Sequence, residues 1–264
     1  MNRYFLCDRG RFGYGYVNRD DRPRHPQWRT VAEDSAVALS VDAALDRGSH
    51  ILREAKRVIG IGSPRASLES NYQLRHLVGA ENFSTGIAAR ELAGLEKMAE
   101  LSRTSGLPTP SLRDVEDHDA VFVLGEDLIQ SAARVGLAVR QAVLGRREEL
   151  AGERGIPEWN AAAIKTLGQD SCHPLYVAYP TQTGLDNIAQ PCPALAPQDI
   201  ARLGFAVAHI IDGAAPAVEG LADPLRDAAQ EIAASLLAAK RPLIISGGSL
   251  DSADVLAAAG NVAR

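Results

Sequence analysis

The sequence predicts an α/β fold: two Rossmann-like lobes with mostly parallel sheets, preceded by a short irregular basic segment. Short apolar, β-branched runs alternate with longer stretches in which apolar residues recur every three or four positions. The short runs are continuously apolar, which is typical of strands buried on both faces of a parallel sheet. Alternation of such strands with helices predicts right-handed crossover units.

The predicted strands are bounded by glycine, proline or charged residues. Four such strands are predicted, at 58–61, 121–124, 175–178 and 243–245. A weaker pattern predicts a fifth at 82–85.

The predicted helices each carry one apolar stripe. Ile129, Ala132, Gly136, Val139 and Val143 follow helical spacing, so we expect one helix over 128–144. Similar stripes predict helices around 200–210 and 225–239, and a last helix at about 253–263. For the helix around 225–239, the pair 223–224 (Asp-Pro) supplies a cap and a first helical residue.

Composition is that of a soluble globular chain. Of 264 residues, 46% are hydrophobic and 23% are charged, and no apolar run approaches the roughly 20 residues that span a bilayer. No signal peptide follows the initiator, and three scattered cysteines argue against a disulfide framework. We therefore expect a cytoplasmic protein.

Positive charge is concentrated at the start of the chain. Residues 1–30 contain seven arginines and three aspartates, although the net charge of the chain is −5. A basic arm can contact nucleic acid, but the acidic remainder and the lack of a stacking-aromatic array argue against that partner. A subunit interface is the favoured interpretation, and simple solvation of these arginines is the alternative.

Cys7 lies at the centre of this arm, among glycines, arginines and aromatic residues. Glycines allow close backbone approach to a bulky inorganic group, and arginines and backbone amides can donate hydrogen bonds to cluster sulfurs. A cluster normally takes four protein ligands, however, and no C-x-x-C occurs in the chain. Cys7 alone could supply only part of such a site.

The run 5–18 (FLCDRGRFGYGYVN) resembles the large iron–sulfur subunits of bacterial NADH–quinone oxidoreductase, respiratory complex I. The runs VIGIGSPRAS at 58–67, DAVFVLGED at 119–127 and RPLIISG at 241–247 resemble the same family, in the same order. In that family the cysteine of the FLCDRGR motif is the last ligand of a [4Fe–4S] cluster. The resemblance implies that Cys7 has this role, with its three partner cysteines upstream in the full-length subunit.

The family's central region is related to molybdopterin oxidoreductases, and this resemblance implies a domain order. Residues 1–35 would hold the end of the cluster motif and the basic arm, 36–118 a first α/β lobe and 119–215 a second. Residues 216–264 would return to the first lobe.

The resemblance also implies partners and location. We expect a scaffold fragment that contacts other subunits of the peripheral arm on the cytoplasmic side of the inner membrane. Membrane contact would be made only through the complex. No activity is expected for the isolated chain, and a stable cluster or bound molybdopterin is not expected in it.

Three further patterns have a chemical and a structural interpretation. Gly60-Ile61-Gly62 is placed like a dinucleotide fingerprint, but Arg65 stands where the third glycine belongs, which favours a tight turn capped by Ser63. Glu126-Asp127 could bind a metal, but Asp127 is better placed to cap the following helix. Cys172-His173 and Cys192 lack the close pairing of zinc ligands, so free thiols are favoured.

No nucleophile–base arrangement is identified, so no catalytic residue is predicted. The alternative function is an active molybdopterin-dependent oxidoreductase resembling formate dehydrogenase. It would need a cysteine, selenocysteine or serine ligand to molybdenum, and neither Cys172 nor Cys192 stands in such a motif.

Overall fold

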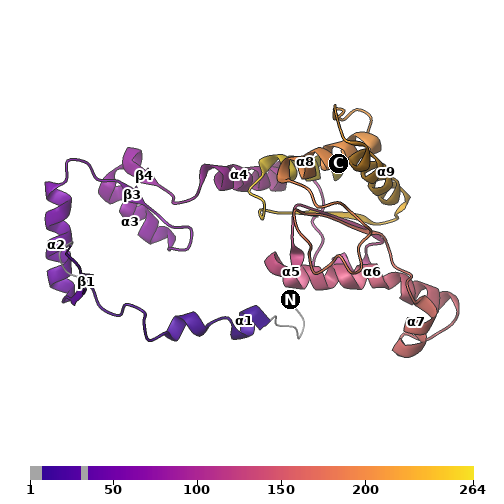
Figure 1. Cartoon of the computed structure of the whole chain (residues 1–264), viewed down its shortest axis with the longest axis horizontal. Coiled ribbons are helices and arrows are strands. Elements are labelled where there is room, and N and C mark those ends of the chain that lie inside the picture. The colour runs from indigo at the N-terminus through magenta and orange to yellow at the C-terminus, as the bar shows by residue number, and fades with distance from the viewer. Residues whose placement is uncertain (1–7, 31–34) are drawn as a thin grey trace. The chain divides into compact units, whose positions relative to one another are not determined.

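The computed structural model describes residues 8–30 and 35–264, which form two compact units (Figure 1). The larger comprises Ala89–Arg264, and the smaller comprises the described residues up to Ala88. The smaller unit contains these elements: α1 (Asp8–Phe12), η1 (Gly15–Asn18), β1 (Gln27–Trp28), β2 (Val37–Ala38), α2 (Val41–Glu54), β3 (Gly60–Ile61), α3 (Leu68–Val78), η2 (Ala80–Asn82) and β4 (Phe83–Ser84).

The smaller unit is built from two strand pairs. β1 and β2 are antiparallel, and the Arg47 guanidinium of α2 lies 4.7 Å from the centre of the Trp28 ring, a cation–π contact. β3 and β4 are parallel and joined through α3, with Gly60 opposite Phe83. The weak strand expected at 82–85 is therefore present as β4, and it completes a strand–helix–strand crossover.

The turn between β3 and α3 differs from the expectation that Ser63 caps the helix. α3 begins at Leu68, and Ser67 is its cap, with its hydroxyl accepting from the backbone N–H of Ser70 at 3.1 Å. Ser63 instead closes a separate turn, which Asn71 fastens to the helix. The Asn71 side chain accepts from the Ser63 N–H at 3.0 Å and donates to the Ser63 carbonyl at 2.9 Å.

The larger unit is a three-layer α/β structure. Its elements are α4 (Ala89–Thr104), η3 (Asp114–Asp117), β5 (Ala120–Leu124), α5 (Leu128–Ser131), α6 (Ala133–Glu153), α7 (Ala161–Gly168), β6 (Leu175–Ala178), α8 (Pro197–Ile211), α9 (Asp223–Ala238), β7 (Pro242–Ser246) and α10 (Ala253–Val262).

Its sheet is parallel throughout, in the order β6-β5-β7. All five residues of the central strand are buried, and their side chains alternate between two cores. Phe122 and Leu124 pack with α8, α9 and α10 on one face, whereas Val121 and Val123 pack with α6 on the other. Figure 1 shows α5 and α6 on one side of the sheet and α8 and α9 on the other.

The layers approach closely at Gly204 of α8. A Cβ added there would lie 2.7 Å from Leu124 Cδ2 and 2.9 Å from the Ala258 Cβ of α10. Real Cβ atoms do not approach this closely, so glycine allows α8 to pack against β5 and α10 at the same time.

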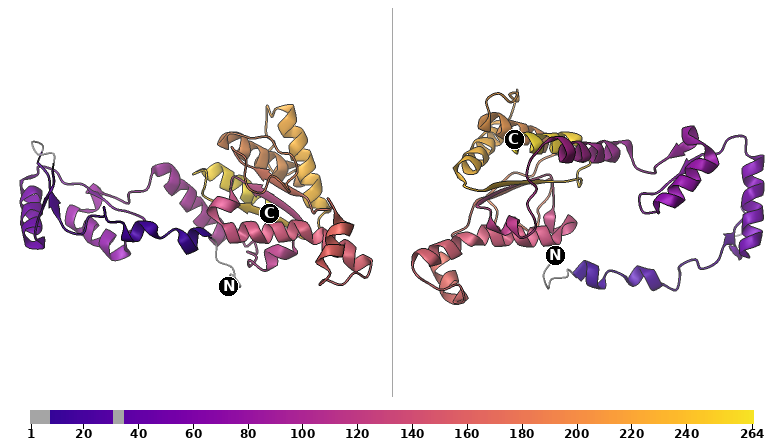
Figure 2. Two further views of the ribbon diagram at one scale, coloured as in Figure 1. Left: turned by 60° about the horizontal axis from the view of Figure 1, so that its bottom comes forward. Right: turned by 180° about the vertical axis from the view of Figure 1, so that it is seen from behind.

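We expected residues 216–264 to return to the first lobe, but the closing strand within them does not. β7 pairs with β5 over five residues, from Ala120 opposite Pro242 to Leu124 opposite Ser246. The physical reason is that β5 is buried on both sides and needs a hydrogen-bonding neighbour at each edge, which β6 and β7 supply. α4, placed in the first lobe by the sequence, likewise packs on α10, and the two are side by side in both views of Figure 2.

The helix expected over 128–144 is interrupted. α5 ends at Ser131, Ala132 has non-helical angles (φ −147°, ψ 61°), and α6 then runs to Glu153. The expected cap is confirmed, since Asp127 accepts from the backbone N–H groups of Ile129 at 3.0 Å and Gln130 at 3.3 Å.

Candidate functional site

The carboxyl edge of the β6-β5-β7 sheet is the place where this architecture would hold a ligand. The chain leaves β5 toward α5 and α6 on one face of the sheet, and leaves β7 toward α10 on the other. A crevice between two such diverging loops is the usual ligand site of open parallel sheets. The two loops here are 125–127 and 247–252.

Glu126 bridges the two loops where such a crevice would lie. The residue is 5% exposed, and it is the one buried charged or polar residue among the described ones. The carboxylate accepts hydrogen bonds from the backbone N–H of Ser249 at 2.8 Å and from the Ser131 hydroxyl at 2.9 Å. The Ser249 hydroxyl also donates to it. Glu126 thereby joins the loop after β5 to the loop after β7.

Both loops contain a glycine in a crowded position, and the one after β7 leaves room for this carboxylate. A Cβ at Gly247 would lie 2.4 Å from Glu126 Oε1, so a larger residue there would displace the side chain. Gly125 has φ of +78°, and a Cβ on it would lie 2.6 Å from Val255 Cγ1. The position of Glu126 therefore depends on glycine at position 247, in a loop far from it in the sequence.

The donors around Glu126 are of the kind that hold anionic ligands. A backbone N–H and a hydroxyl at the end of a parallel strand commonly bind phosphate or a similar group. Here the carboxylate of the protein already takes the Ser249 donors. Nearby, burial raises the pKa of Tyr179, and the negative charges of Asp127 and Glu126 raise it further.

The side chains of Glu126 and Asp127 are engaged within the protein, which argues against the metal-binding interpretation. Asp127 caps α5, and Glu126 accepts three hydrogen bonds within the protein. Across the described ranges 8–30 and 35–264, no three His, Cys, Asp or Glu side chains are grouped so that they could hold a metal ion. The sequence did not predict the interaction with Ser249, which lies 123 positions away.

The Gly60–Gly62 turn of the smaller unit is likewise filled by protein atoms. A Cβ at Gly60 would meet Val78 Cγ2 at 2.9 Å, and one at Gly62 would meet Asn71 Oδ1 at 2.4 Å. These glycines allow α3 and Asn71 to pack closely against β3. The turn interpretation is therefore supported, although its helix cap is Ser67.

The amino edge of the sheet carries a charged cluster that ties the strand starts together. The Asp119 carboxylate, just before β5, accepts from the backbone N–H groups of Lys240 at 2.9 Å and Arg241 at 2.8 Å, just before β7. Burial raises the pKa of Asp119, but these two donors and the nearby His173 lower it by more, so the net pKa is lowered.

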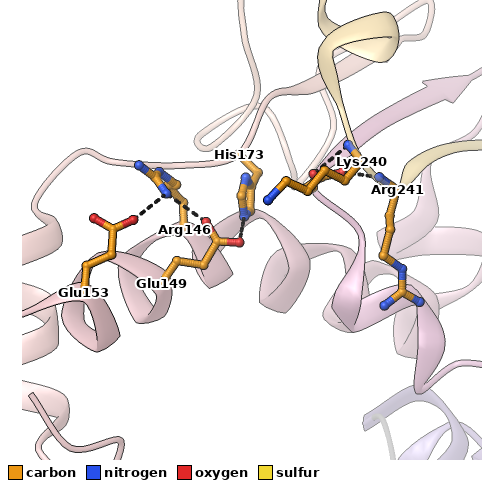
Figure 3. Close-up of polar contacts among 7 residues, drawn as sticks. Arg146, Glu149, Glu153, His173, Lys240 and Arg241 are labelled. Carbon is orange, nitrogen blue, oxygen red and sulfur yellow. Dashed lines mark hydrogen bonds and ion pairs between the residues drawn. The ribbon is translucent and has the colours of Figure 1, made fainter. Parts of the chain in front are cut away.

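His173, just before β6, extends the cluster to α6. Its Nε2 lies 3.3 Å from Glu149 Oε1, and Arg146 lies 2.8 Å from Glu149 and 3.8 Å from Glu153 (Figure 3). The backbone N–H of His173 also donates to the Val143 carbonyl at 2.9 Å. These contacts hold β6 against α6, so we assign the cluster a structural role.

The basic arm and the cysteines give the remaining sequence-predicted candidates. Every described residue of α1 is exposed, and Arg19 pairs with Asp21 at 2.5 Å. Cys7, the predicted cluster ligand, lies outside the described residues. Cys172 packs with the core on the α6 face and Cys192 with the core on the opposite face, and burial raises the pKa of Cys192 to about 11.

Comparison with known proteins explains the resemblance seen in the sequence. All 264 residues align with the G subunit of NADH-quinone oxidoreductase from Pseudomonas fluorescens at 54% identity. The chain is similar, along its entire length, to a segment of the NADH-quinone oxidoreductase G subunit. Identity is 51% to the Salmonella typhimurium protein and 50% to that of Escherichia coli K12, again over the whole chain.

The chain spans only 28–29% of the length of these relatives. No protein-family model matches it. In the part of the chain that the structure describes, no helix is both long and apolar enough to cross a bilayer.

Proposed function

We propose that this chain is a structural segment of the G subunit in an NADH–quinone oxidoreductase, respiratory complex I. The whole protein would work in the transfer of electrons from NADH to a quinone, bound to other subunits of the peripheral arm. It would lie on the cytoplasmic side of the inner membrane and contact the membrane only through the complex. Identity of 50–54% over the whole chain supports this assignment.

The observation that carries the scaffold role is the buried Glu126. In an active molybdopterin enzyme or a dinucleotide-binding protein, the crevice between the β5 and β7 loops would present free donors to an anionic cofactor. Glu126 takes the Ser249 N–H and hydroxyl and closes one loop on the other. Residues 89–264 would therefore act through their surface, as a rigid support for neighbouring parts of the complex.

Cys7 is proposed as one ligand of a [4Fe–4S] cluster in the full-length subunit. Such a cluster takes four ligands, and this chain has three cysteines. Cys172 and Cys192 pack on opposite faces of one sheet, so they do not fit a shared site. The remaining ligands would come from the longer protein, and no step of electron transfer is assigned to the described residues.

The test of the cluster assignment is Cys7→Ala in the full-length subunit, with Cys172→Ala as the matched control. Iron analysis and low-temperature electron paramagnetic resonance should show that Cys7→Ala loses one tetranuclear cluster, about four iron atoms per subunit. The control should keep its full iron content. An unchanged iron count in Cys7→Ala would refute the ligand role.

The scaffold role is tested separately by elemental analysis of the purified chain, handled anaerobically. We expect no stoichiometric molybdenum and no pterin fluorescence after denaturation. Stoichiometric molybdenum with pterin would establish the alternative, a catalytic molybdopterin domain.

A further inference from the structure

The outer edge of β7 faces a groove in the larger unit. Within the described residues, in the order β6-β5-β7, this strand has a neighbour on one side only. The groove has a volume of about 900 Å³ and is lined by β7 itself, by Met98 and Leu101 of α4, by Leu256 of α10 and by the 105–110 segment. Leu237, a further lining residue from α9, is 60% exposed. An edge strand beside apolar side chains is a site for another strand.

The handedness of the crossovers says which way the sheet continues. The connection from β5 to β6 passes over the α6 face, and the connection from β6 to β7 passes over the opposite face and runs back beyond β5. The two connections cross opposite faces and run in opposite directions, so both have the same hand, as the right-handed crossover rule requires. α10 packs on α8, on the face used by the second connection. A right-handed connection through α10 therefore leads in the same direction, to the free edge of β7.

The path of the chain agrees with this direction. Val262, Ala263 and Arg264 line the groove together with Arg241 and Pro242, the residues at the start of β7. α10 thus brings the polypeptide back to the end of β7 at which a parallel neighbour would begin. No long connection would be needed to reach the groove.

We propose that the groove binds a fourth parallel strand, supplied by the polypeptide that follows position 264 in the full-length subunit. The inference rests on the proposed function, because that assignment makes this chain a segment of a protein whose relatives extend well beyond the matched 28–29%. The strand would be mainly apolar, since α4 and α10 present Met98, Leu101 and Leu256 to it. Its side chains would complete both cores at the β7 edge.

The backbone geometry selects the amide that reports this pairing. The Val121 N–H donates to the Pro174 carbonyl next to β6, so odd-numbered amides of β5 face β6 and even-numbered amides face β7. Phe122 lies opposite Ile244. In a parallel pair the residue opposite such an inward-facing one directs its own N–H away, so the Ile244 N–H points to the free edge and that of Ile245 points to β5.

The experiment is residue-resolved amide hydrogen exchange on the isolated chain and on the purified full-length subunit. We expect the Ile244 amide to exchange at least roughly tenfold more slowly in the full-length subunit. The Ile245 amide is the internal control and should be slow in both proteins. Equal exchange of Ile244 in the two proteins would overturn the proposal. Slowing that appears only in the assembled complex would also overturn it, because the occupant would then be another subunit.

A pair of variants gives a second measurement. Ile244→Ala and Ile244→Pro both shorten the side chain, but only proline removes the outward N–H. In the full-length subunit Ile244→Pro should lower the Tm more than Ile244→Ala, and the extra loss should be smaller in the isolated chain. An equal extra loss in both would contradict a fourth strand. Neither experiment depends on iron, so the cluster assignment fails or holds independently.

Discussion

Replacement of Glu126 is the sharpest test of the closed crevice. Glu126 is 5% exposed, and its carboxylate accepts hydrogen bonds from Ser249 N–H at 2.8 Å, the Ser249 hydroxyl and the Ser131 hydroxyl. Hydrogen bonds to a charged group contribute about 1.5–3 kcal/mol each. Water can replace part of this at Ser131 and Ser249, which are exposed, and removal of the buried charge regains some desolvation free energy. Glu126→Leu should therefore lower the free energy of unfolding by about 2 kcal/mol.

Glu126→Gln should cost less, about 1 kcal/mol, because the amide oxygen can still accept from the Ser249 N–H. Thermal unfolding of the chain, followed by far-ultraviolet circular dichroism, measures both. At about 2–4 °C per kcal/mol, we expect the Tm to fall by about 4–8 °C for leucine and about 2–4 °C for glutamine. Asp127→Asn is the matched control, since asparagine caps a helix as well as aspartate does. A leucine variant as stable as the unchanged chain would refute the reasoning.

Three further predictions concern the larger unit. The pKa of Asp119 is lowered by backbone donors that outweigh burial, so the stabilisation by its carboxylate is complete above the ordinary pKa of 3.8 and is lost as pH falls through the folded pKa. Asp119→Asn should therefore flatten the acid limb of a curve of stability against pH, and an unchanged limb would contradict this. Burial raises the pKa of Cys192 to about 11, so its alkylation by iodoacetamide at pH 8 should be slow until urea unfolds the chain; rapid labelling of the folded protein, lost in Cys192→Ser, would be the opposite result. Gly204→Ala should destabilise by about 1–3 kcal/mol in urea unfolding because its Cβ would meet Leu124 at 2.7 Å, whereas Gly213→Ala, with open space around it, should have little effect.

Strand positions were the most predictable part of this protein. The runs predicted at 121–124, 175–178 and 243–245 became β5, β6 and β7, each within one residue of its predicted bounds. A continuously apolar run is a local property that follows from burial on both faces, so it can be recognised without knowing the strand's neighbours. The cap at Asp127 was predictable for the same reason, because the capping carboxylate and the backbone N–H groups that donate to it lie within three residues.

Contacts between distant residues were not predictable in this way. The sequence placed the last strand in the first lobe, but the structure pairs β7 with β5. The sequence showed Glu126 as half of an acidic pair, but not that its carboxylate would accept hydrogen bonds from Ser249. The assignment of Cys7 as a cluster ligand stays a prediction, carried by the motif around it.

By itself, the sequence determined the α/β class, the position of most elements and the similarity to one family of complex I subunits, because each depends on residue types along a short stretch. The tertiary structure decided the order β6-β5-β7, the closure of the crevice by Glu126 and the free edge of β7. Each of these depends on contacts between residues far apart in the sequence, from Val121 opposite Leu175 to Glu126 with Ser249. Apolar periodicity records that a residue is buried, but it does not record against which partner.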